Sequence, residues 1–195
     1  MRPIRTERLI LRNWEERDRD LFHRINSDER VMEFFPFRRD RAAADAKMDE
    51  IRAWIDEDGY GFAAAEIAAT GECIGFVGIT GTEDEDVLPA GTIEIGWRLA
   101  PEFWGKGYVT EAAEAWLAYG FETLGLDEIV SFAVAENHRS IAVMKRLGMR
   151  ADPAGDFDHP AVPDSHPHLK RHVLYRLPRD DCRQGKERLA SRPFR

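Results

Sequence analysis

The sequence predicts a single domain of the α/β or α+β class, and two patterns carry that prediction. Short strand patterns separated by turn residues fill positions 62–99, which is typical of antiparallel hairpins. Helix and strand patterns then alternate up to position 178, which gives two strand–helix–strand crossovers. With 195 residues, of which 43% are hydrophobic, the chain can bury one core without disulfides or a structural metal.

The N-terminal part predicts one short strand and two helices. Residues 9–12 have a strand pattern, and apolar residues at helical spacing predict a helix within 15–27. A second helix is expected over 40–58, because apolar residues recur every three or four positions and Gly59 follows as a natural stop. Between the helices, the Phe-Phe-Pro-Phe segment 34–37 cannot continue a helix. It forms either a lid on the core or a wall of a substrate site.

The rest of the chain predicts strands first and then alternating elements. The expected elements are strands within 62–99, a helix over 109–124, a strand over 128–135, a helix over 140–147 and a last strand over 172–177. Eight of the fifteen glycines lie between Gly71 and Gly107, which suggests bulges or a close approach of the backbone to a ligand. The tail 179–195 has few apolar residues, and we expect a basic, mobile extension or a segment that docks on a partner.

Charge and composition restrict the function classes. The tail carries six Arg or Lys against three acids, so residues 1–178 hold a net charge of −11, whereas the whole chain has −8. This opposes nucleic-acid binding and favours cationic partners such as amines. No apolar run reaches the roughly 20 residues that cross a bilayer, and Cys73 and Cys182 have no metal or redox spacing. We therefore expect a cytoplasmic protein with no membrane partner.

A strand followed by a glycine-spaced loop and a helix is the most informative segment. The strand pattern over 92–99 leads to Gly105-Lys106-Gly107, and an amphipathic helix begins directly afterwards. Glycines allow successive backbone N–H groups to face one anion, and the helix N-terminus adds partial positive charge. This arrangement suits a pyrophosphate. Thr110 replaces the third glycine of a dinucleotide fingerprint, and the P-loop pattern is also absent.

Several motifs together resemble the GNAT superfamily of acyl-CoA-dependent N-acetyltransferases, most closely its ribosomal-protein N-terminal acetyltransferase branch (RimJ/RimL type). The motifs are Thr6-Glu7-Arg8-Leu9-Ile10-Leu11-Arg12, Glu94-Ile95-Gly96-Trp97, Trp104-Gly105-Lys106-Gly107-Tyr108-Val109-Thr110-Glu111-Ala112, Glu136-Asn137-His138-Arg139-Ser140 and Lys145-Arg146-Leu147-Gly148-Met149. The resemblance covers residues 5–178. It implies a central mixed, mostly antiparallel sheet flanked by helices, whose fourth and fifth strands splay apart to admit acetyl-CoA.

The resemblance also implies how acetyl-CoA is held. The backbone of Trp97, Arg98 and Leu99 would pair with the pantetheine, and Asn137 would hydrogen-bond it near the thioester. Residues of the glycine loop and the following helix would hold the pyrophosphate, namely Gly105, Lys106, Gly107, Tyr108, Val109 and Thr110. Lys106 and Lys145 are candidates for phosphate contacts, or else solvated charges. Glu102 departs from the family pattern, which has Gln or Arg there, and we expect its side chain to point away.

Glu94 and Ser140 are the candidate catalytic residues. Along the strand, Glu94 and Arg98 share one face, opposite the apolar stripe. Partial burial would raise the pKa of Glu94 and make it the base that takes the ammonium proton; alternatively, it is a surface carboxylate paired with Arg98 or a neighbour. Many family members have a Tyr that acts as the acid toward the departing thiolate, and this chain has Met144 at that position. By resemblance to the branch, Ser140 would assist the departing thiolate; otherwise it is a first-turn helix residue.

The expected reaction is direct attack of a primary amine, on a protein N-terminus or a small molecule, within a ternary complex. The alternative is a non-catalytic acyl-CoA-binding or sensing module, which the missing Tyr favours. Phe35, Phe37 and Trp54 are candidates for the acceptor wall, with core packing as the alternative. The Pro- and His-rich stretch 152–171 lacks metal-ligand spacing, so we expect no metal and a loop that closes over the acceptor. The family resemblance is compatible with a homodimer.

Overall fold

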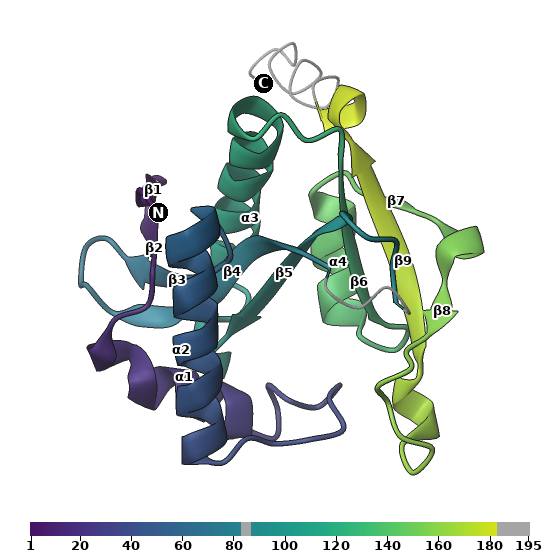
Figure 1. Ribbon diagram of the computed structural model, residues 1–195, viewed down its shortest axis with the longest axis horizontal. Helices are drawn as coiled ribbons and strands as arrows, with labels where there is room; N and C mark the ends of the chain where they lie inside the picture. The colour runs from purple at the N-terminus through teal and green to yellow at the C-terminus, as the bar shows by residue number, and fades with distance from the viewer. Residues whose placement is uncertain (83–86, 183–195) are drawn as a thin grey trace.

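The computed structural model describes residues 1–82 and 87–182 (Figure 1). The acidic run Glu83–Asp86 and residues 183–195 of the basic tail lie outside this range. The described strands are β1 (Ile4–Arg5), β2 (Leu9–Arg12), β3 (Phe62–Ile67), β4 (Cys73–Gly81), β5 (Ile93–Leu99), β6 (Glu128–Val134), β7 (Arg150–Ala151), β8 (Phe157–Asp158) and β9 (Arg171–Pro178). The α-helices are α1 (Arg19–Ser27), α2 (Arg41–Asp58), α3 (Tyr108–Ala118) and α4 (His138–Arg146).

The strands form one sheet in the order β1-β2-β3-β4-β5-β6-β9-β7, and β8 also pairs with β9. All neighbouring strands are antiparallel except β5 and β6, which are parallel. Seven register pairs join β4 to β5, whereas a single pair, Glu94 with Val130, joins β5 to β6. The two strands therefore separate beyond Glu94. This confirms the expected mixed, mostly antiparallel sheet with two splayed strands.

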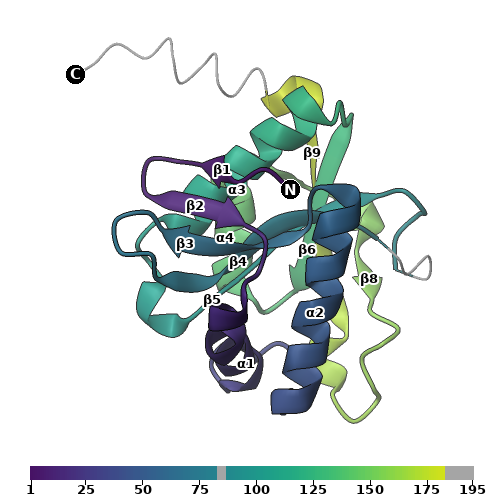
Figure 2. The same cartoon turned by 60° about the vertical axis from the view of Figure 1, so that its left-hand side comes forward.

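Helices cover both faces of the sheet. Figure 2 shows α1 and α2 in front of the strands and α3 and α4 behind them. On the α1 side, Trp14 packs edge-to-face on Phe22 with ring centroids 4.9 Å apart. On the other side, Trp116 of α3 is fully buried among apolar residues. Burial of both faces explains why a chain of this length forms its core without disulfides.

The predicted elements are confirmed, with differences at their ends. The helix predicted over 15–27 begins as the 3-10 turn Glu16–Asp18, and the one predicted over 109–124 changes at Tyr119 to a π turn that ends at Thr123. The helix predicted from Ser140 starts at His138, because the Asn137 side chain caps it. Three two-residue strands, β1, β7 and β8, are too short to show any alternation in the sequence. Further 3-10 turns are Pro101–Phe103, Pro153–Gly155 and Pro167–Leu169.

A buried ionic network ties the first strands to the start of α1. The Arg12 guanidinium donates to Asp18 Oδ2 at 2.6 Å and to Glu66 Oε2 at 2.7 Å, and all three residues are buried. Arg17 adds a contact to the same Glu66 oxygen at 2.8 Å. Buried charges need such partners, so this network holds β2, β3 and α1 in one arrangement. Within residues 1–82 and 87–182, no helix is long and apolar enough to cross a membrane.

Candidate acetyltransferase site

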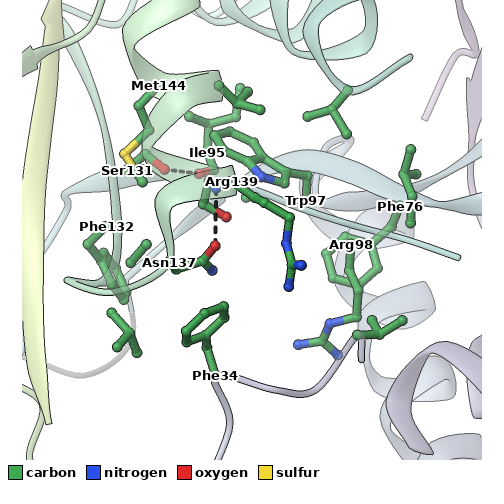
Figure 3. Close-up of a pocket in the computed structure, with 18 of the residues that line it drawn as sticks. Phe34, Phe76, Ile95, Trp97, Arg98, Ser131, Phe132, Asn137, Arg139 and Met144 are labelled. Atoms are coloured by element: carbon green, nitrogen blue, oxygen red, sulfur yellow. Dashed lines mark hydrogen bonds between the residues drawn. The ribbon is translucent and has the colours of Figure 1, made fainter. Parts of the chain in front are cut away.

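A large cavity opens where β5 and β6 separate. Its volume is about 1160 Å³, and β5, β6, α3, α4 and the α1–α2 connection all contribute to its wall (Figure 3). The Ser131 hydroxyl donates to the Ile95 carbonyl at 2.9 Å, close to the point of separation. Alternation along β5 puts Glu94 and Arg98 on the α1 side, and Ile95, Trp97 and Leu99 on the side of α3 and α4. The cavity thus connects the two faces of the sheet.

The glycine loop presents an open anion site at one end of this cavity. Gly105 and Gly107 have φ values of +72° and +81°, which favour glycine. A Cβ added at Gly105 would meet no atom within 4 Å, so the space beside the loop is free. Gly107 is the N-cap of α3, and the N–H groups of the first turn have no acceptor inside the helix. These features fit a pyrophosphate.

The N-terminal motif holds this loop in place. Glu111 of α3 accepts hydrogen bonds from Thr6 Oγ1 at 2.5 Å and from the Arg8 backbone N–H at 2.7 Å. The Arg8 side chain donates to the same carboxylate at 2.6 Å and to the Lys106 carbonyl at 3.0 Å. Its guanidinium also lies over the Tyr108 ring. Residues about 100 positions apart are therefore joined at the start of α3.

Most of the expected donor-site residues line the cavity. They are Trp97, Arg98, Leu99, Gly105, Gly107, Tyr108, Val109, Thr110 and Asn137. The Leu99 carbonyl already accepts a hydrogen bond from Trp104 Nε1 at 2.8 Å, so one of its acceptor positions is taken. The Asn137 side chain accepts from the Ser140 N–H at 3.1 Å through Oδ1. Its amide NH₂ group forms no hydrogen bond within the part of the chain that the structure describes.

The two candidate lysines do not line the cavity, and an arginine does instead. Lys106 lies over the Phe103 ring, and Lys145 is on a different face of α4 from the lining residues. Arg146 lines the cavity, and its Nη1 donates to Thr110 Oγ1 at 3.2 Å. Helical spacing could have identified it, since Arg139, Val143 and Arg146 share one face of the helix. Glu102 does not line the cavity, and its carboxylate accepts a hydrogen bond from Arg24 at 2.6 Å. Its side chain thus points away from the glycine loop, as expected.

Glu94 lies in the cavity as a partly exposed side chain. No hydrogen bond or ion pair reaches it from residues 1–82 or 87–182. Burial raises the pKa of Glu94 to about 7. The alternative pairing with Arg98 is not formed, because the Arg98 guanidinium donates to Asn26 Oδ1 at 2.5 Å. The carboxylate can therefore take up a proton near neutral pH.

Ser140 also lines the cavity, near Met144. Met144 is fully buried and provides no proton donor where many family members have Tyr. Two other lining hydroxyls already have contacts: Ser131 donates to Ile95, and Thr110 accepts from Arg146. A thiolate leaving group needs little acid assistance, since thiols have a pKa of about 8.5. The assistance of the thiolate by Ser140 stays a prediction, and the structure shows that Ser140 lies on the cavity wall.

The acceptor candidates divide between two cavities. Phe35 and Phe37 line the large cavity, as does Phe34. Trp54 instead lines a separate cavity of about 210 Å³ together with Tyr60. Sequence spacing could not separate the two groups, because the position of α2 depends on tertiary packing.

The His-rich stretch contributes His159 to the large cavity, with His172 beside it. Burial lowers the pKa of His172, which keeps its ring neutral at pH 7. His166 and His168 are outside the lining. Among the residues that the structure describes, no group of three or more His, Cys, Asp or Glu side chains is arranged to hold a metal.

Comparison with known proteins decides the family. Residues 8–150 match the acetyltransferase (GNAT) domain model. The chain belongs to the GNAT acetyltransferase family. It is 30% identical over 159 residues to the uncharacterized N-acetyltransferase YnaD of Bacillus subtilis, a match that covers 76% of this chain and 83% of YnaD. This chain is therefore an acyltransferase enzyme.

Other GNAT relatives agree in sequence and in structure. The FsC-acetyl coenzyme A-N(2)-transacetylase of Aspergillus fumigatus is 29% identical over 152 residues, which cover 75% of this chain and 64% of that protein. A GNAT acetyltransferase structure from Bacillus anthracis superposes with a TM-score of 0.75 at 26% identity, covering 91% of this chain and 99% of the other. The matched range 8–150 includes β5, β6, α3, α4 and the loop that precedes α3.

Proposed function

We propose that this chain is an acetyl-CoA-dependent N-acetyltransferase that acetylates a primary amine by direct attack within a ternary complex. One observation carries the proposal: Glu94, a carboxylate without a partner among residues 1–82 and 87–182 and with a pKa of about 7, lines the cavity where β5 and β6 separate. A base with this pKa can accept the proton of an ammonium group near neutral pH. The relative from Aspergillus fumigatus is likewise named as an acetyl coenzyme A transacetylase.

The donor end of the cavity supports acetyl-CoA as the acetyl source. The first turn of α3 and the Arg146 guanidinium offer N–H donors to phosphate oxygens. The amide NH₂ of Asn137 is available to the pantetheine arm, which would pass through the gap between β5 and β6. The residues proposed to hold the acetyl donor thus all lie at this cavity.

The proposed step is an aminolysis of the thioester. The amine nitrogen forms a bond to the acetyl carbonyl carbon, and the carbon–sulfur bond breaks. Glu94 takes one ammonium proton, directly or through water, before the attack. The second proton, which the nitrogen loses as the amide forms, passes through water to the departing sulfur, or to solvent while Ser140 hydrogen-bonds the thiolate. A covalent acyl-enzyme is disfavoured, because Cys73 lies outside the cavity and burial raises the pKa of its thiol to about 12.

The acceptor is a protein N-terminus, as the RimJ/RimL-like motifs suggest, or a small amine. Release of CoA thiol from acetyl-CoA, measured with N-terminal peptides, polyamines and small amines, tests the proposal. Glu94→Gln is expected to lower kcat/KM about a hundredfold or more with acetyl-CoA affinity retained. Glu57→Gln, an exposed carboxylate on α2, is the matched control and should retain activity. If acetyl-CoA binds but no amine increases thiol release, the proposed function is wrong.

A further inference from the structure

The arginines that line the β5–β6 cavity differ in whether a carboxylate neutralises them. Two of them form ion pairs, Arg30 with Asp28 at 2.7 Å and Arg139 with Glu33 at 2.6 Å. Arg98 and Arg146 form no ion pair with any residue in 1–82 or 87–182. Charges removed from bulk water are normally paired, so the half-buried Arg98 guanidinium is suited to an anion that arrives with a substrate. The Arg146 guanidinium is exposed to solvent.

The guanidinium groups of Arg98 and Arg146 lie at different ends of the cavity. Arg146 lies at the start of α3, where the phosphates of the acetyl donor would bind. Arg98 lies on the α1 side of β5, on the same face as Glu94 and in contact with the α1–α2 connection. Donor phosphates therefore account for Arg146, and they leave Arg98 without a counter-ion.

Neutral groups hold the Arg98 side chain in place. Its Nη1 donates to Asn26 Oδ1 at 2.5 Å, and its guanidinium carbon lies 4.4 Å from the Phe35 ring centroid and 5.4 Å from that of Phe76. The Asn26 amide is itself fixed by donation to the Phe22 carbonyl at 2.7 Å. Figure 3 shows the guanidinium of Arg98 pointing toward the open space beside Phe34. The contacts orient the cation without neutralising it.

A second cation strengthens the local positive field. The Arg39 backbone N–H donates to the Asn26 carbonyl at 2.9 Å, and its guanidinium lies 4.6 Å from the Phe37 ring centroid. Burial lowers the pKa of Arg39, and the nearby charge of Glu50 partly opposes this decrease. Glu50 forms its ion pair with Lys47 and not with Arg39. Burial and the charge of Arg39 lower the pKa of Arg98 to about 9, which leaves it protonated at pH 7.

We propose that the amine acceptor also carries a carboxylate, and that Arg98 binds this carboxylate while the amine lies near Glu94. The inference rests on the proposed function and adds a substrate class to it. It adds to the expectation drawn from the net charge: the acceptor keeps its ammonium group, and the Arg98 guanidinium offers a second, cationic contact although the chain is acidic. A polyamine, with no anionic group, would leave Arg98 without a counter-ion.

The strand geometry indicates how far apart the two groups of the acceptor lie. Glu94 and Arg98 are four residues apart on β5, which separates their Cα atoms by about 13 Å at about 3.3 Å per residue. An ω-amino acid, or a peptide N-terminus followed by an acidic residue, spans more of this separation than an amine and a carboxylate on the same carbon.

Matched acceptors that differ only in their remote group test the inference. The small-molecule arm compares δ-aminovalerate with its neutral amide and with the diamine cadaverine, each as acceptor for thiol release from acetyl-CoA. The peptide arm compares Ala-Asp-Ala and Ala-Asn-Ala, both with amidated C-termini. A carboxylate preference of about tenfold or more in kcat/KM is expected in at least one arm, and the arm that shows it identifies the source.

Variants assign the preference to Arg98. Arg98→Gln is expected to raise the KM for the carboxylate acceptor about tenfold to a hundredfold, with little change for the neutral acceptor or for acetyl-CoA. Arg98→Lys should restore much of the preference. Arg24→Gln, which removes an exposed charge outside the cavity, should leave it unchanged.

The outcomes separate the inference from the proposed function. If neutral or cationic acceptors react as well as carboxylate acceptors, the inference is wrong and the N-acetyltransferase function stands. If no amine is acetylated although acetyl-CoA binds, the proposed function fails first. The wild-type comparison needs no substitution, so it decides the matter even if Arg98→Gln does not fold.

Discussion

Replacement of Glu94 by Gln is expected to stabilise the protein at high pH while it removes activity. The Glu94 carboxylate lies in the cavity without a partner among residues 1–82 and 87–182, and burial raises its pKa from 4.5 to about 7. Between these two values the folded state binds more protons than the unfolded state. The free energy of unfolding of the wild type therefore falls as pH rises through this window.

The size of the effect follows from the pKa shift. At about 1.4 kcal/mol per pKa unit, the rise from 4.5 to about 7 corresponds to about 3 kcal/mol of destabilisation above pH 7. Gln is neutral at every pH and does not carry this penalty. Relative to the wild type, Glu94→Gln should gain about 2.5 kcal/mol between pH 5 and pH 8.

Urea unfolding of both proteins at the two pH values, without acetyl-CoA, measures this difference. Glu57→Gln, on the exposed face of α2, is the matched control and should follow the wild type. If the stability difference between wild type and Glu94→Gln is the same at pH 5 and pH 8, the carboxylate is well solvated. The argument for Glu94 as a base with a raised pKa would then fail.

Three further substitutions test other parts of the structure. Arg146→Gln should raise the KM for acetyl-CoA about tenfold with kcat nearly unchanged in steady-state assays, because it removes a cation beside the phosphate loop. Arg12→Met leaves Asp18 buried without its counter-ion and leaves Glu66 with Arg17 alone, so urea unfolding should show a loss of about 3–5 kcal/mol. Cys73→Ser should keep kcat/KM within about twofold, since the protonated thiol lies outside the cavity.

Each of these predictions has a contrary outcome. An unchanged KM for acetyl-CoA in Arg146→Gln would place the donor phosphates elsewhere. A stable Arg12→Met variant would mean that water or rearrangement compensates the two carboxylates. Loss of turnover in Cys73→Ser, with the fold intact by circular dichroism, would argue for a covalent intermediate.

Much of the fold was predictable because its signals are local. The apolar stripe of α2 and the glycine that follows it lie within one stretch of sequence, and so does the strand–loop–helix segment around Gly105 and Gly107. The separation of β5 from β6 is different. Only one register pair joins these strands, and its two residues are about 35 positions apart in the sequence. Local patterns therefore could not predict where the strands separate, and only the family resemblance could.

The site was predictable where strand or helix periodicity places a side chain. Alternation along β5 predicted the shared face of Glu94 and Arg98, and the structure confirms that placement. It could not predict that Arg98 contacts Asn26 instead of Glu94, because that contact depends on how α1 packs against the sheet. Trp54 was assigned to the acceptor wall from its residue type alone, and it lies in the smaller cavity.

The pH dependence of kcat/KM for the wild type and Glu94→Gln tests most directly whether Glu94 is the base. It is measured with an amine that the wild type acetylates. For the wild type, the profile should rise through an inflection near pH 7, because only the ionised carboxylate can accept the ammonium proton. Glu94→Gln should lack this inflection and retain only the slope that comes from ionisation of the amine. If both proteins give the same profile, with the inflection near pH 7 retained, Glu94 is not the base.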